Sequence, residues 1–308
     1  METMNHKIVN FGKRVIPDAL LPTIQKYYNK HYYDRPTIQK IIAAYSDSND
    51  TEIQNIVKYI SRNGLIAFPY EWADRFTPQN RKKINSIQIF KDKEYDLPYV
   101  YLGEEKLYFP NDWDDQKIRI NYFGLQEIEQ HLLSPHCYLS EDFVVDENSI
   151  VVDCGVAEGN FSLSIVEKCK KLYLFEPEEQ WMEPLKATFA PWKDKVVIVQ
   201  KYLSDITDEV NITLDDYFAD KEYPNFLKLD VEGYEKQVLL GSKKILSSDD
   251  LKKVVTCIYH KADDEDVLGA LLCNHGFITS KTPGYTTLSL DNKYPYLRHG
   301  VIRATKSS

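Results

Sequence analysis

Residues 151–160 decide the fold of this chain, and they read Val151-Val152-Asp153-Cys154-Gly155-Val156-Ala157-Glu158-Gly159-Asn160. The apolar start predicts a β-strand, and the residues from Gly155 onward predict a glycine turn that opens a helix. A glycine lets the backbone approach a ligand closely, and the first turn of a helix offers free N–H groups to it. Many α/β proteins have such a turn for tight packing only, so the turn alone does not establish a binding site.

The spacing of the glycines distinguishes two kinds of cofactor. The dinucleotide pattern G-x-G-x-x-G fails, because Ala157 and Asn160 occupy its second and third glycine positions when it is aligned on Gly155. The pattern acid-x-G-x-G-x-G, typical of S-adenosylmethionine sites, fits better, with Asp153 and Gly159 in place and Ala157 as the one departure. A cofactor with a cationic sulfonium and ammonium, and without a pyrophosphate, tolerates a nearby carboxylate. The stretch therefore favours S-adenosylmethionine over a dinucleotide.

The rest of the second half alternates short apolar runs with helical stretches. The runs predict strands at 150–154, 172–175, 196–199, 226–229 and 254–259. One of the helices is expected to have Tyr234, Val238, Gly241 and Ile245 on one side. This alternation predicts a parallel sheet covered by helices on both faces, a Rossmann-like α/β fold. The stretch 277–304 has strands and turns and fits a final hairpin on that sheet.

Polar residues follow the second and third predicted strands. Glu176 ends the second strand, roughly 20 residues after Gly155, where an acid can accept both ribose hydroxyls of a nucleoside. A solvated strand end is the alternative, and the glycine turn makes the ribose role the favoured one. Ser204 and Asp205 follow the third strand and would lie near an adenine ring, although a simple turn explains them equally well.

Asp230 and Glu232 follow the fourth strand and precede a glycine and a helix. Because ligands bind at the carboxyl ends of strands in such sheets, Asp230 is expected close to the methyl donor and acceptor. Methyl transfer to oxygen is an in-line displacement that requires positioning and deprotonation of the nucleophile, which a carboxylate or imidazole can assist. Glu232 is explained nearly as well as an acid at a helix N-terminus. Asp230 could instead hold the amino group of the cofactor or a metal.

His260 follows the fifth strand and is a candidate general base. A lone histidine is more often structural, but its place at the ligand edge of the sheet favours a catalytic role. The acids 263–266 are most simply the start of a helix. A divalent metal held by Asp230, His260 and one of these acids remains open, although the spacing gives it no specific support.

The composition limits which binding partners and which cellular compartment are expected. The chain has 308 residues and a formal net charge of −9, which argues against wide contact with nucleic acid. No apolar run is long enough for a membrane span, and the first ten residues lack the apolar stretch of a signal peptide. The five cysteines form no C-x-x-C pair and are typical of reduced thiols in a protein of the cytoplasm.

These motifs together resemble the FkbM-type S-adenosylmethionine-dependent methyltransferases. The resemblance covers roughly residues 126–304, and its most specific parts are the Asp-Val-Glu-Gly run at 230–233, the Phe-Glu-Pro step at 175–177 and Tyr-His-Lys at 259–261. It implies a class I methyltransferase fold and O-methylation, often of sugars in surface polysaccharides or of secondary metabolites. It also implies a set of cofactor-binding residues, namely Asp153, Gly155, Ala157, Glu158, Gly159, Asn160, Glu176, Pro177, Ser204, Asp205 and Asp230, and a reaction centre formed by Asp230, Glu232 and His260.

Two residues depart from the family pattern. Ala157 replaces a middle glycine, which the fold tolerates if φ is negative there, and Cys154 replaces a small aliphatic residue and is expected only to pack. The predicted domains are 1–125, a helical and β-hairpin region, and 126–308, the S-adenosylmethionine-binding methyltransferase domain. The first region matches no family, and we expect it to select the substrate, to cover the site or to form an oligomer contact.

Three functional hypotheses follow from the sequence. The leading one is a methyltransferase that acts on a hydroxyl of a sugar, glycan or other small molecule, either alone or as a homo-oligomer. The second is a module with the methyltransferase fold that has no catalytic activity and serves as a binding or assembly subunit. A nicotinamide-dependent oxidoreductase is the third, and the failed glycine pattern speaks against it. Nucleic-acid methylation is disfavoured by the charge and because Val231, Glu232 and Gly233 follow Asp230, where amino-methylating enzymes have a Pro-Pro-Tyr-type motif.

Overall fold

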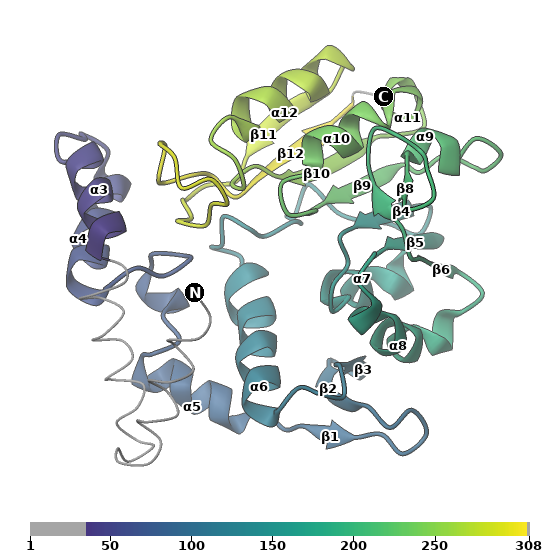
Figure 1. Ribbon diagram of the computed structural model, residues 1–308, viewed down its shortest axis with the longest axis horizontal. Helices are drawn as coiled ribbons and strands as arrows, with labels where there is room; N and C mark the ends of the chain where they lie inside the picture. Colours follow the sequence, from purple (N-terminus) through teal and green to yellow (C-terminus); the bar gives the residue numbers. More distant parts are fainter. Residues whose placement is uncertain (1–34, 307–308) are drawn as a thin grey trace. The chain divides into compact units, whose positions relative to one another are not determined.

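The computed structural model describes residues 35–306 and divides into two compact units, one ending at Lys83 and the other beginning at Ile84 (Figure 1). The first unit contains helices α3 (Arg35–Tyr45) and α4 (Thr51–Asn63), and α5 (Pro78–Ser86) crosses the division. Asp50 caps α4 by accepting from the backbone N–H groups of Glu52 and Ile53, and Gly64 ends it with φ +90°.

A small antiparallel sheet opens the second unit. It consists of β1 (Phe90–Lys91), β2 (Pro98–Leu102) and β3 (Glu105–Tyr108), in that order. The turn between β2 and β3 contains Gly103 with φ +63°, a conformation that glycine adopts readily. Val100 and Leu107 share one hydrophobic core with residues of the main sheet and of its helices. The role predicted for residues 1–125, and their separation from 126–308, stay predictions.

The main sheet has seven strands in the order β11-β12-β10-β9-β4-β5-β6, and only β12 runs antiparallel to its neighbours. The strands are β4 (Ile150–Cys154), β5 (Lys171–Phe175), β6 (Val196–Val199), β9 (Phe226–Leu229), β10 (Lys253–Cys257), β11 (Ile278–Lys281) and β12 (Val301–Thr305). This order confirms the predicted mixed α/β fold. The chain passes from β4 outward to β6 and then returns to β9, so the switch point lies between β4 and β9, where ligands bind in such sheets.

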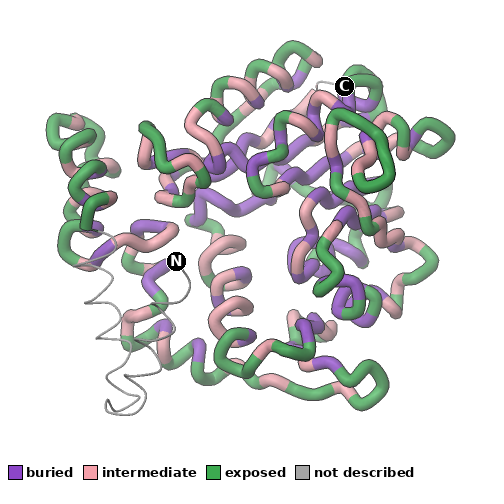
Figure 2. The backbone as a smooth tube through the Cα atoms, viewed as in Figure 1, coloured by how far each residue is buried: buried purple, intermediate pink, exposed green. Residues whose placement is uncertain are grey.

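Helices cover both faces of the main sheet. Along β4, Val151 belongs to a core with α7 (Asn160–Ile165) and α8 (Glu179–Thr188), whereas Val152 belongs to a core on the other face. That second core contains residues of α9 (Leu214–Tyr217), α10 (Glu235–Leu240), α11 (Lys243–Ser247) and α12 (Asp264–Asn274). The central strands are accordingly buried along most of their length (Figure 2). Each fully buried valine or leucine contributes about 1.5–3 kcal/mol, so these two cores stabilise the platform for the site.

One predicted element differs from the structure. The single helix expected through Tyr234, Val238 and Ile245 is wrong, because it is interrupted at Gly241 between α10 and α11. A Cβ atom on Gly241 would lie 2.1 Å from the backbone oxygen of Ser204, so this glycine is needed for the close approach of two segments. Asp215 then accepts from the backbone N–H groups of Lys244 and Ile245 at the start of α11.

None of the helices within residues 35–306 has both the length and the apolar character needed to cross a membrane.

Candidate active site

A cavity of about 480 Å³ lies at the carboxyl ends of the central strands. This volume is within the range of about 300–1,000 Å³ that is usual for small-molecule sites. The residues that line it come from the end of β5, from the short strands β7 (Tyr202–Leu203) and β8 (Asn211–Ile212), from loops of the sheet and from α8. They are Gly155, Ala157, Phe175, Glu176, Pro177, Glu178, Trp181, Lys201, Tyr202, Leu203, Ser204, Asn211, Asp230, Val231, Glu232 and Tyr234. The cavity therefore occupies the switch point at which the topology places a ligand.

The glycine turn is fixed by its closest neighbours. Gly155 has φ +77°, and a Cβ atom there would lie 1.8 Å from the backbone oxygen of Asp230, so no other residue fits. The backbone N–H of Asp230 donates to the oxygen of Cys154 at 3.0 Å, which joins the turn to the end of β9. Gly159, with φ +82°, begins α7, and a Cβ atom there would lie 2.9 Å from the side chain of Leu185.

Ala157 does not have the negative φ on which its tolerance was expected to depend. Its φ is +46°, in the left-handed region that costs a residue with a Cβ atom about 1–2 kcal/mol. Its backbone N–H donates to Glu176 Oε2 at 2.8 Å, a bond to a buried carboxylate that helps to hold this conformation. The alanine is thus accepted with strain and with a compensating hydrogen bond.

Glu176 is held at the end of β5 by two backbone hydrogen bonds. Oε2 accepts from Ala157, and Oε1 accepts from the backbone N–H of Glu178 at 2.9 Å. Only 4% of Glu176 is exposed, and burial raises the pKa of its carboxyl above the ordinary value even though these bonds lower it. Its carboxylate borders the cavity, and Pro177 follows it there.

Of the remaining predicted residues, Glu158, Asn160 and Asp205 do not line the cavity, whereas Ser204 does. Glu158 is buried, accepts a hydrogen bond of 2.6 Å from Asn121 Nδ2, and has its pKa raised by burial to about 7. Asn160 is buried in the first turn of α7. Ser204 lines the cavity, whereas Asp205 is exposed and accepts from the Ser204 hydroxyl at 3.2 Å.

Asp153 lies behind the glycine turn rather than in the cavity. It is 1% exposed, and its Oδ1 is 2.8 Å from the Nζ of Lys228, while Oδ2 accepts from the Ser162 hydroxyl at 2.6 Å. Its two oxygens thus face protein groups. Asp153 is near the predicted site but is not brought to its surface.

Asp230 is the centre of the polar cluster next to the cavity. Its Oδ2 accepts from the Tyr138 hydroxyl at 2.6 Å and lies 3.4 Å from His136 Nε2. Burial by itself would raise the pKa of Asp230, but His136, Lys228 and His260 together lower it well below its usual range. The carboxylate therefore stays ionised and is a weak proton acceptor.

His260 is oriented by a buried carboxylate on α10. Its Nδ1 is 2.9 Å from Glu235 Oε1, and Glu235 is fully buried. Its Nε2 faces Asp230 Oδ1 at 3.7 Å and Glu232 Oε2 at 3.5 Å. Burial opposes the charged imidazole, but Glu235, Asp230 and Glu232 raise the pKa of His260 above its ordinary value. The structure therefore brings Asp230, Glu232 and His260 together, as the sequence predicted.

Glu232 approaches this centre through an unusual backbone conformation. It has φ +52°, and its side chain is 81% exposed. Partial desolvation beside the cluster and the negative charge of Asp230 raise the pKa of Glu232 above its ordinary value. Glu235 accepts from the backbone N–H groups of Val231 and Gly233, at 3.0 and 3.3 Å, and so fixes the loop that contains Glu232. Strained residues of this kind often lie at functional sites.

Asp230 also belongs to two clusters of side chains that could bind a metal ion. Asp230 with Glu235 and His260 forms one group, and Asp230 with His136 and Cys257 forms another, with the potential ligand atoms of each group within 4.8 Å of one another. Both groups already contain close polar pairs between their own side chains. Asp264, one of the acids considered at the sequence level, instead accepts from the backbone N–H of Lys261 at 2.6 Å. A metal here stays a hypothesis.

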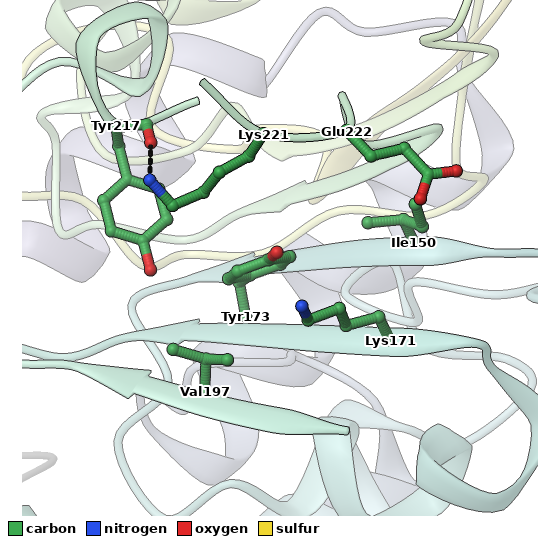
Figure 3. Close-up of a pocket in the computed structure, with 7 residues that line it drawn as sticks. All are labelled: Ile150, Lys171, Tyr173, Val197, Tyr217, Lys221 and Glu222. Carbon is green, nitrogen blue, oxygen red and sulfur yellow. Dashed lines mark hydrogen bonds between the residues drawn. The ribbon is translucent and has the colours of Figure 1, made fainter. Parts of the chain in front are cut away.

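A second hollow, of about 300 Å³, lies at the opposite ends of the strands (Figure 3). It is lined by Ile150, Lys171, Tyr173, Val197, Tyr217, Lys221 and Glu222. Lys171 lies over the ring of Tyr173 at 5.2 Å, and Lys221 donates to the backbone oxygen of Tyr217 at 2.7 Å. None of the sequence-predicted site residues lines this hollow, and it is not at the switch point of the sheet.

The sequence did not identify several side chains of the site. Trp181, Lys201 and Asn211 line the cavity from segments without a recognisable motif. His136 and Tyr138 contact Asp230 from a loop before β4. Lys228 had a usable signal, because a lysine inside a strand buried on both faces conflicts with the apolar pattern, and such conflicts are expected at functional sites.

Comparison with known proteins agrees with the motifs. Residues 199–279 match the model of the methyltransferase FkbM domain, which confirms the family resemblance for this part of the chain. No curated protein matches the chain in sequence. A solved methyltransferase FkbM from Methylobacillus flagellatus is 14% identical over 86% of this chain, with a TM-score of 0.43, and this chain spans only 64% of its length.

Two further solved structures are similar to about half of the chain. An rRNA methylase from Streptococcus thermophilus is 21% identical, with 54% of this chain and 90% of that chain covered and a TM-score of 0.36. The magnesium protoporphyrin IX methyltransferase from Synechocystis, solved with bound S-adenosylmethionine, is 14% identical, with 52% and 71% covered and a TM-score of 0.36.

Proposed function

Because residues 199–279 match the methyltransferase FkbM domain, we propose that this chain transfers a methyl group from S-adenosylmethionine to a hydroxyl of a sugar, glycan or other small molecule. The observation that carries the proposal is the cavity at the β4–β9 switch point, which is bordered by Gly155, Glu176 and Asp230. A glycine turn and a buried acid at the end of the second strand of the Rossmann-like half can bind a nucleoside, and the acid after its fourth strand lies at the same edge of the sheet.

The residues present fit S-adenosylmethionine. Gly155 lines the cavity, and because it has no side chain its backbone could lie close to the cofactor. Glu176 would accept the ribose hydroxyls, and Ser204 would lie beside the adenine with Asp205 in support. Of the other predicted residues, Ala157, Pro177 and Asp230 border the cavity, whereas Asp153, Glu158, Gly159 and Asn160 would act by holding the turn in place.

The chemistry of the site suits an oxygen nucleophile. S-Adenosylmethionine, when bound, supplies a methyl group on a sulfonium, whose departure needs no acid. As the methyl group leaves sulfur for the acceptor oxygen, His260 Nε2 would take up the proton of the acceptor hydroxyl. Glu235 holds the opposite ring nitrogen and stabilises the imidazolium that forms. Asp230, with its lowered pKa, stays anionic and supports the positive charge at His260.

The cofactor is tested by calorimetric titration of the purified protein with S-adenosylhomocysteine, with NAD run in parallel. We expect micromolar binding of S-adenosylhomocysteine and none of NAD. A folded protein that does not bind S-adenosylhomocysteine would contradict the proposal and favour a silent binding module, and binding of NAD would favour an oxidoreductase. A positive result leads to an acceptor screen among sugars and glycan fragments.

The substitution Glu176→Gln is expected to weaken the binding of S-adenosylhomocysteine about 10- to 100-fold. The loss of a hydrogen-bonded charge costs about 1.5–3 kcal/mol, and the amide would replace one acceptor oxygen with an NH2 group that can only donate. Glu179→Gln is a matched control, because Glu179 is exposed on α8 and does not line the cavity. Equal dissociation constants for the Glu176 variant and the wild type would remove Glu176 from the cofactor site.

A further inference from the structure

Lys228 occupies a position where an apolar residue is expected. It lies within β9, and among residues 35–306 it is the one buried lysine, with 3% of its surface exposed. Its register partner on the neighbouring strand β4 is Asp153. The two side chains therefore meet at the switch point of the sheet, directly behind the glycine turn.

The ammonium group of Lys228 has two close partners. Nζ is 2.8 Å from Asp153 Oδ1, and it donates a hydrogen bond of 2.6 Å to the backbone oxygen of Gly155. Asp153 is in turn held by the Ser162 hydroxyl of α7. Lys228 also lies 5.3 Å from the ring centre of Tyr138, the residue that donates to Asp230. One side chain thus links the cofactor turn with the reaction centre.

Stability alone does not account for this arrangement. Two charges buried together lose their hydration, and a buried ion pair can often be replaced by uncharged groups without loss of stability. The contact with Gly155 is what an uncharged pair would not reproduce. Because a trans peptide is planar with its C=O and N–H on opposite sides, holding the oxygen of Gly155 toward Lys228 directs the N–H of Val156 away from it. No acceptor within residues 35–306 pairs with that N–H.

We propose that Lys228 is a positioning residue for cofactor binding, which Asp153 holds in place and which fixes the peptide plane after Gly155. Asp153 then acts through Lys228, which explains why an acid of the glycine motif is buried away from the cavity. This inference rests on the proposed function, since the turn is positioned for S-adenosylmethionine. It assigns to the pair a role in ligand affinity that can be separated from a role in folding.

The test uses the double variant Asp153→Asn/Lys228→Met, which removes both charges together. Lys228→Met alone would leave the Asp153 charge buried without its partner and is expected to destabilise the protein. The double variant is expected to unfold at nearly the wild-type urea concentration, but to bind S-adenosylhomocysteine about tenfold more weakly or worse. Hydrogen exchange of the free protein is expected to be faster at the amides of residues 155–157.

The surface pair Lys170 and Glu222 provides the matched control. Its Nζ–Oε1 distance is also 2.8 Å, but its side chains are 51% and 66% exposed. The variant Lys170→Met/Glu222→Gln is expected to match the wild type in affinity and in exchange at residues 155–157. If the Asp153/Lys228 variant also matches the wild type in both measurements, the pair is structural only and the proposal is overturned.

Two outcomes are kept apart by this design. If the wild type itself does not bind S-adenosylhomocysteine, the proposed function fails, while the exchange comparison in the free protein still decides whether Lys228 fixes the turn. Should the double variant not fold, Asp153→Asn/Lys228→Gln keeps a neutral polar pair with a shorter side chain at 228. The same losses are expected from it, and wild-type affinity and exchange would again overturn the proposal.

Discussion

Asp230→Asn is expected to lower the rate of methyl transfer about 10²- to 10³-fold, while the protein stays folded and its cavity keeps its shape. The reason is electrostatic. Tyr138, His136 and His260 all face this carboxylate, and its lowered pKa keeps it charged. Asparagine keeps the size and an oxygen that can accept from Tyr138, but it removes the charge that stabilises a protonated His260 during the reaction. Removing one preorganised electrostatic group from an active site has effects of this size.

The measurement is the release of S-adenosylhomocysteine with an acceptor found in the sugar screen, together with a circular dichroism spectrum to verify folding. Asp220→Asn is a suitable control, because the side chain of Asp220 is 84% exposed and pairs with neighbouring Lys221 on the surface. Wild-type turnover in the Asp230 variant would remove Asp230 from the mechanism. Loss of folding would instead identify it as structural.

Gly155→Ala is expected to destabilise the protein by roughly 3–5 kcal/mol or to prevent folding. Two effects add at this position, because φ is +77° and the new Cβ atom would lie 1.8 Å from the backbone oxygen of Asp230. That oxygen belongs to a backbone fixed by its own bond to Cys154, so it has little freedom to move away. The free energy of unfolding in urea measures the loss.

Gly276→Ala separates the two effects. Gly276 has a similar φ of +83°, but a Cβ atom there would have no neighbour within 4 Å. Only the conformational cost applies, and we expect a loss of about 1 kcal/mol. If both variants lost the same free energy, the close contact between the glycine turn and Asp230 would not exist in solution.

Much of the fold could be predicted from local sequence patterns. The central strands are apolar runs whose neighbouring residues face opposite sides, as Val151 and Val152 do, and these runs identify a sheet with two covered faces. The residues at the strand ends, Glu176, Asp230 and His260, could be predicted to lie at one edge of the sheet because parallel strands bring their carboxyl ends together there. The order and direction of the strands were enough to group these three side chains, without knowledge of any contact between them.

The remaining features depend on contacts between distant segments. Nothing near Asp153 indicates that Lys228 is its partner, because that pairing follows from the register of β4 and β9. The pairing of His260 with Glu235 requires α10 and the end of β10 to meet, which no local pattern specifies. The positive φ of Ala157 was also missed, since the sequence shows a residue with a Cβ atom but not the hydrogen bond from its N–H to Glu176.

The position of β12 has a consequence for how the sheet assembles. This strand comes last in the described chain, yet it lies between β10 and β11 and pairs with both. β11 therefore has no partner on the sheet until β12 is in place, so a chain interrupted before Val301 would lose two strands rather than one. It would also leave β10 as an open edge of unpaired backbone groups, which is a template for aggregation. Both the pairing of β11 and the protection of the β10 edge therefore depend on β12.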